Sequence, residues 1–461
     1  MNNKLIVGQR LFAALALGTL LYSCQPQIDL APEQTGQARV AAQGDYVPGE
    51  VLIKFKSGTD DAKVSKALGK VKASKVEKIL TEMMKKTGDD QGVTHATTSL
   101  DVMAAISELQ ALPEVEYAEP NYIYTTDATS NDPYFTSGQL WGMLATNVNG
   151  SQAATAWAAN HTGASNVIVG IIDEGWMHTH ADLAGNGWVN PFEIAGNKKD
   201  DDGNGYIDDV TGWDFAGNNA STYDGTSDDH GTHVAGTIGG KGNNGLGVVG
   251  VCWTVKMIGL KFLGANGGTS ANAIKAIDYL TDLKTRHRLN IVASNNSWGG
   301  GGASSLLQAA IERANTANIL FVAAAGNGGS DGAGDDNDVV ANYPSNYPNA
   351  NVIAVAAITS TGTQSSFSNF GATQVDIGAP GSGIWSTIPG NGNTSSYASY
   401  NGTSMATPHV TGAVALYAAT KPNSSAATIK NAILSSIVST TSLIGKTATG
   451  GRLDANAALS K

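Results

Sequence analysis

The sequence predicts a three-layer α/β/α protein with a mainly parallel sheet, preceded by a small α+β domain. Apolar runs rich in Val and Ile recur at residues 167–172, 255–260, 291–294, 319–324 and 352–357, with helix-like segments between them. Strands that are apolar throughout are buried on both faces, as parallel strands covered by helices are. Residues before about 130 follow a different pattern, in which a stretch of alternating apolar and polar positions indicates a half-exposed strand.

The composition is that of a globular protein. Of the 461 residues 41% are hydrophobic and 15% charged, which suffices for a large core and more than one domain. The net charge is −11 and no basic block stands out, so nucleic acid is not an expected partner. We expect a monomer. Of the two cysteines, Cys252 lies in an apolar run and is expected to be a core residue rather than half of a disulfide.

Residues 1–24 are predicted to be a signal peptide. Two basic residues and an apolar run at 11–21, too short to span a bilayer, precede the sequence Leu21-Tyr22-Ser23-Cys24. A small residue before a cysteine at this place resembles the processing box of bacterial lipoproteins, which implies a lipid on Cys24 and attachment to a membrane. Tyr22 is bulkier than is usual in that box, so ordinary signal cleavage stays open. Both alternatives predict export from a bacterial cell, as a secreted protein or a cell-envelope lipoprotein.

Three further segments follow the signal. Residues 25–45 are polar and are predicted to form a flexible tether. Residues 46–126 are predicted to form the small α+β domain, and residues 131–461 the large α/β domain. In the small domain we expect strands at 46–56 and 115–124, helices at 60–68 and 99–112, and a lysine-rich segment at 71–86. The polar, turn-rich stretch 127–133 reads as a linker and a processing site.

Polar residues follow the predicted strands of the large domain. Ligands of parallel sheets bind beyond the carboxyl ends of the strands. Asp173 comes directly after the run 167–172, where a carboxylate is costly unless it is hydrogen-bonded. His230 stands at the start of a helix of small residues, and Asn327 follows the run 319–324. A lone histidine would more often be structural, so a functional role is expected only because these polar residues occur together.

Ser404 lies in the sequence Asn401-Gly402-Thr403-Ser404-Met405-Ala406-Thr407-Pro408-His409. The small residues before the serine permit a tight turn, and a helix is expected to start at Ser404 with Pro408 in its first turn. A helix N-terminus favours negative charge on a reacting oxygen, which suits a nucleophilic serine. For this motif alone the alternative stays open that Ser404 is simply the N-cap.

Four motifs in order match one family. They are Ile171-Ile172-Asp173-Glu174-Gly175, His230-Gly231-Thr232-His233-Val234-Ala235-Gly236-Thr237, Ala323-Ala324-Ala325-Gly326-Asn327 and Gly402-Thr403-Ser404-Met405-Ala406-Thr407-Pro408-His409. Over residues 130–460 the chain resembles the subtilisin-type serine proteases, or subtilases, whose triad follows the same order of Asp, His and Ser. The resemblance implies a subtilisin-like fold and a serine endopeptidase acting on proteins or peptides without a catalytic cofactor.

The resemblance also implies a role for each residue. Ser404 is expected to attack the scissile carbonyl and His230 to take its proton, while Asp173 orients His230. The Asn327 side chain and the Ser404 backbone N–H are expected to bind the oxyanion. His233 and His409 are expected to be structural. The chain departs from the family at Glu174, where Ser, Thr or Asp is usual, and this places the pH profile in question.

The expected substrate-binding residues are Ser297, Trp298, Gly299, Gly300 and Gly326. The first four match the segment that pairs with an extended substrate, and Gly326 belongs to the wall of the primary specificity pocket. The stretch 343–348 matches the rim of that pocket. Small residues and no evident acidic residue predict a preference for large apolar or aromatic side chains. Trp298 stands where the family often has Leu, which narrows the expected cleft.

A calcium loop is expected between Asp173 and His230. Oxygen side chains alternate in Asp200-Asp201-Asp202-Gly203-Asn204-Gly205-Tyr206-Ile207-Asp208-Asp209, as at the start of a calcium-binding loop. Position twelve is Thr211 rather than Glu, so the full helix-loop-helix motif is absent. The candidate ligands of a structural calcium ion are Asp200, Asp202, Asn204 and Asp208. The alternative is an acidic, solvated turn.

The small domain resembles the propeptides of subtilases of the fervidolysin kind. The matching stretches are its opening at 47–55 and its closing at 113–121. Such propeptides assist folding and inhibit the enzyme until they are cut, so the resemblance implies a self-processed zymogen. If the lipid is on Cys24 and the cut falls near residues 125–131, processing would release the enzyme from the membrane.

Two other functions use the same sequence features. A catalytically silent exported lipoprotein could bind another protein through this fold, but such a relative would be expected to lack at least one of Asp173, His230, Asn327 and Ser404. A hydrolase of small esters would need the same triad, and only a comparison of peptide and ester substrates separates it from a peptidase.

Overall fold

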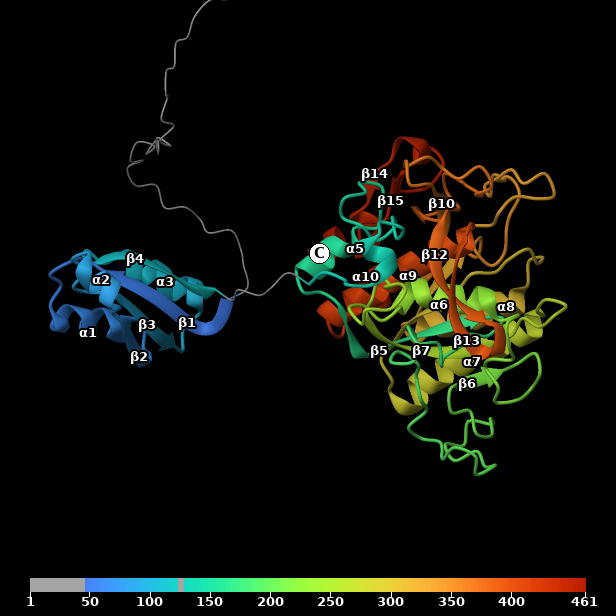
Figure 1. Ribbon diagram of the computed structural model, residues 1–461, viewed down its shortest axis with the longest axis horizontal. Coiled ribbons are helices and arrows are strands. Elements are labelled where there is room, and N and C mark those ends of the chain that lie inside the picture. Colours follow the sequence, from blue (N-terminus) through green and yellow to red (C-terminus); the bar gives the residue numbers. More distant parts are fainter. Residues whose placement is uncertain (1–45, 123–127) are drawn as a thin grey trace, which may run out of the picture. The chain divides into compact units, whose positions relative to one another are not determined.

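The computed structural model describes residues 46–122 and 128–461, which form two compact units (Figure 1). The expected signal peptide, Cys24 and the tether at 25–45 lie outside the described residues, as does the stretch 123–127. Within the described ranges, none of the helices combines the length and apolar character that crossing a bilayer requires.

The first unit is a four-stranded antiparallel sheet with helices. Its strand order is β2-β3-β1-β4, and every neighbouring pair is antiparallel. The elements are β1 (Tyr46–Phe55), α1 (Asp61–Lys70), β2 (Ala73–Ile79), α2 (Glu82–Lys86), β3 (Val93–Thr98), α3 (Val102–Gln110) and β4 (Val115–Tyr122). The alternation in β1 points Val51, Ile53 and Phe55 into a core that α1 and α3 complete.

Three elements of this unit arise where the sequence showed no apolar pattern. The lysine-rich segment 71–86 forms β2 and α2, which bury none of their side chains fully. β2 is an edge strand whose charged side chains face solvent, and such strands carry little alternation. β3 has a regular alternation of half-buried and buried residues, but the residues are small or polar.

The second unit contains a nine-stranded sheet of order β14-β15-β11-β10-β9-β8-β5-β7-β6, parallel throughout except for the β14–β15 pair. Its strands are β5 (Gly163–Asp173), β6 (Gly212–Asp214), β7 (Thr254–Lys261), β8 (Ile291–Asn296), β9 (Leu320–Ala324), β10 (Val352–Ile358), β11 (Ile377–Pro380), β14 (Val438–Ser439) and β15 (Gly451–Arg452). The five predicted strands are the five adjacent strands β10, β9, β8, β5 and β7. The four outer strands are two to four residues long, too short to leave an apolar run.

Helices cover both faces of this sheet, which confirms the three-layer class. The helices are α4 (Pro133–Thr136), α5 (Ala153–Ala158), α6 (Asp229–Gly239), α7 (Ser270–His287), α8 (Ser305–Thr316), α9 (Thr403–Thr420), α10 (Ala426–Ser435) and α11 (Ala455–Ala458). Alternate residues of β5 divide between the faces: Val169 and Ile171 pack with α6 and α9, while Ile168 and Ile172 pack with α7 and α8.

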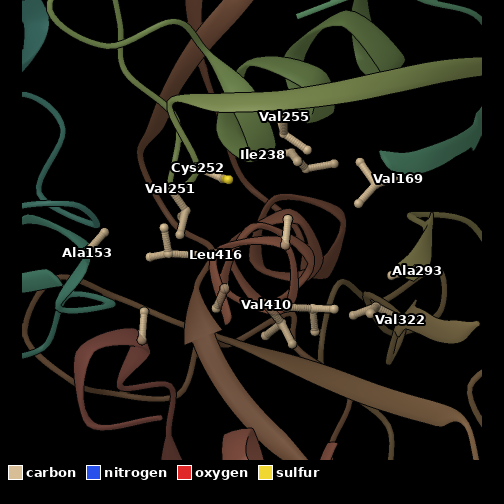
Figure 2. Close-up of a cluster of buried hydrophobic side chains, with 14 of the residues drawn as sticks. Ala153, Val169, Ile238, Val251, Cys252, Val255, Ala293, Val322, Val410 and Leu416 are labelled. Carbon is tan, nitrogen blue, oxygen red and sulfur yellow. The ribbon is translucent and has the colours of Figure 1, made fainter. Parts of the chain in front are cut away.

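Helix α9 is buried on nearly all sides. Figure 2 shows Val410 and Leu416 of this helix among Val169, Ala293 and Val322 from three central strands, and all five side chains are fully buried. Cys252 lies in the same cluster, free and buried, as expected (Figure 2). A helix that is apolar all round belongs in a core. The start of α9 is therefore fixed by the whole domain rather than by local capping.

A hairpin outside the main sheet borders the same region. β12 (Ile384–Gly390) and β13 (Thr394–Tyr400) pair in an antiparallel register, with a short 3₁₀ turn at Asn391–Asn393. Ser386 and Thr387 in β12 donate hydrogen bonds to backbone carbonyls of α6. The hairpin thus fixes α6 from the side away from the sheet.

Candidate active site

Four polar residues from distant parts of the chain meet at the carboxyl ends of the central strands. Asp173 ends β5, His230 is the second residue of α6, Asn327 follows β9 by three residues and Ser404 is the second residue of α9. Parallel strands bring their carboxyl ends to one edge, and the first turns of α6 and α9 begin there. His230, Asn327 and Ser404 line one open cavity of 380 Å³.

The carboxylate of Asp173 is bonded to the imidazole of His230. Asp173 Oδ1 lies 2.9 Å from His230 Nδ1 and also accepts the backbone N–H of Glu174 at 2.8 Å. The Asp173 side chain is fully buried, whereas the His230 side chain keeps 29% of its surface exposed. Burial lowers the pKa of His230, but the carboxylates of Asp173 and Glu174 together raise it by more. The pKa of His230 therefore stands above the usual histidine value.

Ser404 is not the N-cap of its helix. The N-cap is Gly402, which makes no side-chain cap, and α9 starts one residue before the expected position. The Ser404 hydroxyl donates instead to the carbonyl of Ser297 at 3.1 Å and reaches the cavity shared with His230. Geometry therefore argues against a purely capping serine.

Pro408 lies in the second turn of α9, not the first, which corrects the sequence-based expectation. A proline inside a helix has no N–H for the carbonyl four residues earlier, here that of Ser404. The Ser297 hydroxyl donates to this carbonyl at 2.8 Å. Ser297 and Ser404 are thus joined by two hydrogen bonds, one of which supplies the donor that Pro408 lacks.

The amide of Asn327 is oriented by the start of α9. Its Oδ1 accepts the backbone N–H of Thr403 at 2.8 Å and the Thr403 hydroxyl at 3.0 Å. A Cβ built on Gly402 would lie 3.5 Å from Ser404 N and 3.6 Å from Asn327 Nδ2, so both nitrogens face the same space. Two converging N–H donors beside a serine hydroxyl can bind a developing oxyanion.

The other two histidines of the motifs are structural. His233 Nε2 bonds to the carbonyls of Ile384 and Ala398 at 2.9 and 3.2 Å, and its ring stacks on Tyr400. His409 Nδ1 bonds to the carbonyl of Met405 at 2.9 Å. Burial lowers the pKa of His233 to about 3 and that of His409 to about 4, so both are neutral near pH 7.

A second cavity of 250 Å³ opens on the other side of Ser404. Trp298, Gly299, Gly300 and Gly326 line it, as does Asn342, which sequence reasoning did not single out. The lining contains no charged side chain. Ser297 does not line this cavity; it is buried, and its hydroxyl donates to the Ser404 carbonyl.

A third cavity of 350 Å³ shares the Trp298–Gly300 segment with the second. Its large side chains are Phe262, Leu263, Trp298, Leu307 and Tyr343. Tyr343 was expected at the pocket rim, and its carbonyl accepts the N–H of Gly300 at 3.1 Å. Phe262 directly follows β7 and was missed, because an aromatic residue after an apolar strand looks like one more core residue.

The acidic loop brings together only part of the expected ligand set. Carboxylate oxygens of Glu193, Asp200 and Asp202 lie within 4.8 Å of one another. Asp208 is engaged elsewhere, accepting the backbone N–H groups of Asn197 and Lys198 at 3.1 and 2.9 Å. Asn204 donates its backbone N–H to Asp200 and Asp202. Glu193 was missed because it lies seven residues before the motif.

Glu193 carries a feature that points to a missing partner. Its Oε1 accepts the backbone N–H groups of Asp201 and Asp202 at 2.8 and 3.1 Å. Its Oε2 is buried and has no hydrogen-bond partner within the described ranges. A buried carboxylate oxygen beside two further carboxylates is the chemistry that a hard cation satisfies.

Comparison with known proteins places the chain among proteases. The subtilase family model matches residues 164–456, and the fervidolysin N-terminal prodomain model matches residues 32–121. A thermophilic serine proteinase of Bacillus sp. (strain AK1) is 32% identical over 424 residues, covering 91% of this chain and 90% of its own length. Thermitase of Thermoactinomyces vulgaris is 35% identical over 292 residues, covering 63% and 85%.

A solved structure agrees with these matches. A protease of Pseudoalteromonas arctica superposes with a TM-score of 0.57 at 29% identity, over 72% of this chain and 99% of that one. The fold, the meeting of the four motif residues and the relatives lead to one conclusion. The chain belongs to the subtilase family and is a serine endopeptidase made with a fervidolysin-type prodomain.

Proposed function

We propose that Ser404, His230, Asp173 and Asn327 carry out the peptide hydrolysis of this subtilase. The observation that supports the assignment best is the 2.9 Å contact between Asp173 Oδ1 and His230 Nδ1 at the cavity that Ser404 and Asn327 also line. A catalytically silent relative would have no reason to keep this arrangement intact.

The proposed reaction is acyl transfer in two halves. His230 Nε2 takes the Ser404 proton as Oγ attacks the scissile carbonyl, and later gives it to the leaving amine. This requires the Ser404 hydroxyl to leave the carbonyl of Ser297. Asp173 holds the proton on His230 Nδ1 and stabilises the imidazolium. Asn327 Nδ2 and the Ser404 N–H hold the oxyanion, and water then hydrolyses the acyl-enzyme.

The proposed substrate is an extended polypeptide with large uncharged side chains. Residues 297–300 would pair with its backbone. The uncharged 250 Å³ cavity beside Ser404 would take the side chain preceding the cut, and Gly326 leaves it open. The 350 Å³ cavity, with its five large apolar and aromatic side chains, would take a second apolar side chain of the same substrate.

A fluorophosphonate that labels activated serines tests the catalytic assignment. Mass spectrometry should find the adduct on the Ser404 peptide, and His230→Ala should lose it because the hydroxyl is no longer activated. Rates on a peptide amide and on a small ester, measured side by side, distinguish a peptidase from an esterase. An adduct on another serine, or ester hydrolysis without amide hydrolysis, would overturn the proposal.

We also propose that Glu193, Asp200 and Asp202 bind a structural calcium ion. The buried, unpartnered Oε2 of Glu193 supports this beyond the acidic sequence alone. Calcium at a hundred times its Kd should raise the free energy of unfolding by about 2.7 kcal/mol. Glu193→Gln should abolish the rise in Tm, while Asp208→Asn, outside the cluster, should keep it. Equal rises in all three proteins would overturn the site.

The proposal extends to export and processing. The extracellular protease of Xanthomonas campestris is among the similar proteins, and the prodomain match supports a zymogen with peptide substrates and its own propeptide as inhibitor. We propose that Cys24 carries a lipid and that a cut near residues 125–131 frees the catalytic domain of residues 131–461. Membrane fractions should then hold the propeptide without the catalytic domain. A lipid-linked, uncut catalytic domain in washed membranes would contradict this.

A further inference from the structure

The first turn of α6 is held by a side chain from another element. The N-cap residue Asp228 makes no cap, because its carboxylate is bonded to the Lys261 ammonium at 2.6 Å and to the Asp224 N–H at 2.7 Å. Glu174 Oε1 accepts the backbone N–H of His230 at 2.6 Å instead. A capping side chain normally binds the N–H of the second or third helical residue, and His230 is the second.

The same contact joins the end of β5, which carries Asp173, to the start of α6, which carries His230. Glu174 directly follows Asp173, so its backbone N–H donates to the Asp173 carboxylate while its side chain accepts from His230. The approach is very close, since a Cβ on Gly231 would lie 2.0 Å from the Gly175 carbonyl oxygen. Neither element can shift without straining this contact.

We propose that Glu174 is a positioning residue, whose carboxylate fixes the first turn of α6 and thereby the His230 ring against Asp173 and whose charge sets the pH at which His230 becomes a free base. This inference rests on the proposed roles of Asp173, His230 and Ser404. The capping role requires a hydrogen-bond acceptor at residue 174, whereas the electrostatic role requires a charge.

The surroundings of Glu174 are mostly acidic. On its own strand and on the first turn of α6 the neighbouring carboxylates are Asp173, Asp228 and Asp229. In the 530 Å³ cavity that Glu174 lines, the other charged groups are Asp214, Asp224 and Lys261. The Lys261 ammonium binds the Glu174 carbonyl and forms ion pairs with Asp228 and Asp224; among the described residues it forms none with the Glu174 carboxylate. From β13, the Tyr400 hydroxyl donates to Asp229.

These neighbours determine in which direction the pKa values of Glu174 and His230 shift. Burial and the charge of Asp173 raise the pKa of Glu174 to about 7, although the His230 N–H lowers it. When ionised, Glu174 in turn favours the imidazolium form of His230 and raises its pKa. Since the free base of His230 is the active form, removing this charge should make the enzyme active at lower pH.

Glu174→Gln and Glu174→Ala separate the two roles. Gln keeps an acceptor for the His230 N–H without the charge, so the acid side of the kcat/KM profile should move down by about one pH unit. Ala removes the acceptor as well as the charge. Its kcat should be about tenfold lower than that of the Gln variant, with little change in KM, because the base rather than the substrate is misplaced. Asp224→Asn, which removes a nearby charge but keeps the backbone N–H that binds Asp228, should leave the profile unchanged.

The profiles are measured on the processed enzyme with one peptide amide, beside Ser404→Ala that the wild-type enzyme has cut in trans. A Glu174→Gln profile that superposes on that of wild type would overturn the inference, as would equal kcat values for the Gln and Ala variants. If the Ala variant fails to fold, the Gln profile decides alone. Residual amide hydrolysis by Ser404→Ala would instead show that the proposed function itself has failed.

Discussion

Helices α6 and α9 both carry a reacting side chain in their second position, and both are capped from a distance. The His230 N–H binds the Glu174 carboxylate, and the Thr403 N–H binds the Asn327 amide oxygen. Four helices that carry none of the proposed catalytic residues, α7, α8, α10 and α11, use their own N-cap side chains. Capping from a distance fixes a helix start relative to another element, which local capping cannot do.

The two distant caps differ in charge. A neutral amide orients the nucleophile's helix and keeps its own N–H donors free for the oxyanion. A carboxylate orients the base's helix and adds a titrating charge beside the imidazole. Geometry at Ser404 should therefore be insensitive to pH, whereas geometry and charge at His230 should change with pH.

The largest effect on kcat should come from removing the nucleophile on α9 or the base on α6. Ser404→Ala and His230→Ala should each lower kcat by about 10⁶-fold, because nucleophile and base act as a unit. The double variant should lose no more than either single variant, as single-turnover assays on a peptide amide can measure. A multiplicative loss would mean that the two helix starts work independently.

Breaking the neutral cap should come next. Asn327→Ala should lower kcat by about 10²- to 10³-fold, because one oxyanion donor is lost. The acid limb of its kcat/KM profile should keep the wild-type midpoint, since no charge changes. A shift of that limb comparable with that of Glu174→Gln would erase the distinction between the two caps.

The charge of Glu174, which caps α6, should make the free energy of unfolding depend on pH. The pKa of Glu174 is raised in the folded state to about 7 from 4.5, so the folded protein binds this proton more tightly than the unfolded chain does. Its contribution to stability is complete below about pH 4.5 and is lost as the pH rises to about 7. Denaturant unfolding of the Ser404→Ala background should show Glu174→Gln gaining about 1 to 3 kcal/mol between pH 5 and 8 relative to its parent. An unchanged difference across that range would contradict the burial of this charge.

The smallest expected effect concerns the hydrogen bond from Ser297 that replaces the missing N–H of Pro408 in α9. Ser297→Ala leaves the Ser404 carbonyl without its donor and should lower the free energy of unfolding by about 1 to 2 kcal/mol. In a Pro408→Ala background, where residue 408 regains an N–H, the same change should cost less. A double-mutant cycle in urea measures the difference, and additive effects would show that Pro408 does not create the need for Ser297.

The sequence was sufficient to predict the sheet, and it also named the residues for which a catalytic role is proposed. Continuous apolar runs marked the five central strands, and the residues just beyond them, Asp173 and Asn327, stood where parallel sheets bind ligands. The prediction stopped where tertiary contacts decide. Ser404 looked like an N-cap because local pattern cannot reveal that a buried helix needs none. Pro408 was placed one turn early because the Ser297 hydroxyl, which replaces the missing N–H donor to the Ser404 carbonyl, lies 107 residues before Ser404 in the sequence.

Charged neighbours were the hardest feature to foresee. Glu174 was recognised as unusual, but only the fold brings its carboxylate to the His230 N–H. Asp208 fitted the spacing of a calcium loop, yet it binds two backbone N–H groups, while Glu193 enters from outside the motif. A side chain's position in a motif does not state which way the loop turns it.

The most direct test of the account is the intact mass and N-terminal sequence of the purified full chain beside Ser404→Ala. The wild-type protein should lose about 125 residues, because a competent triad cuts its own prodomain, and the variant should stay uncut. That result would establish nucleophile, peptide-bond activity and prodomain boundary together. Both proteins remaining full length although folded, or both being cut at the same site, would contradict the assignment of Ser404 as the self-processing nucleophile.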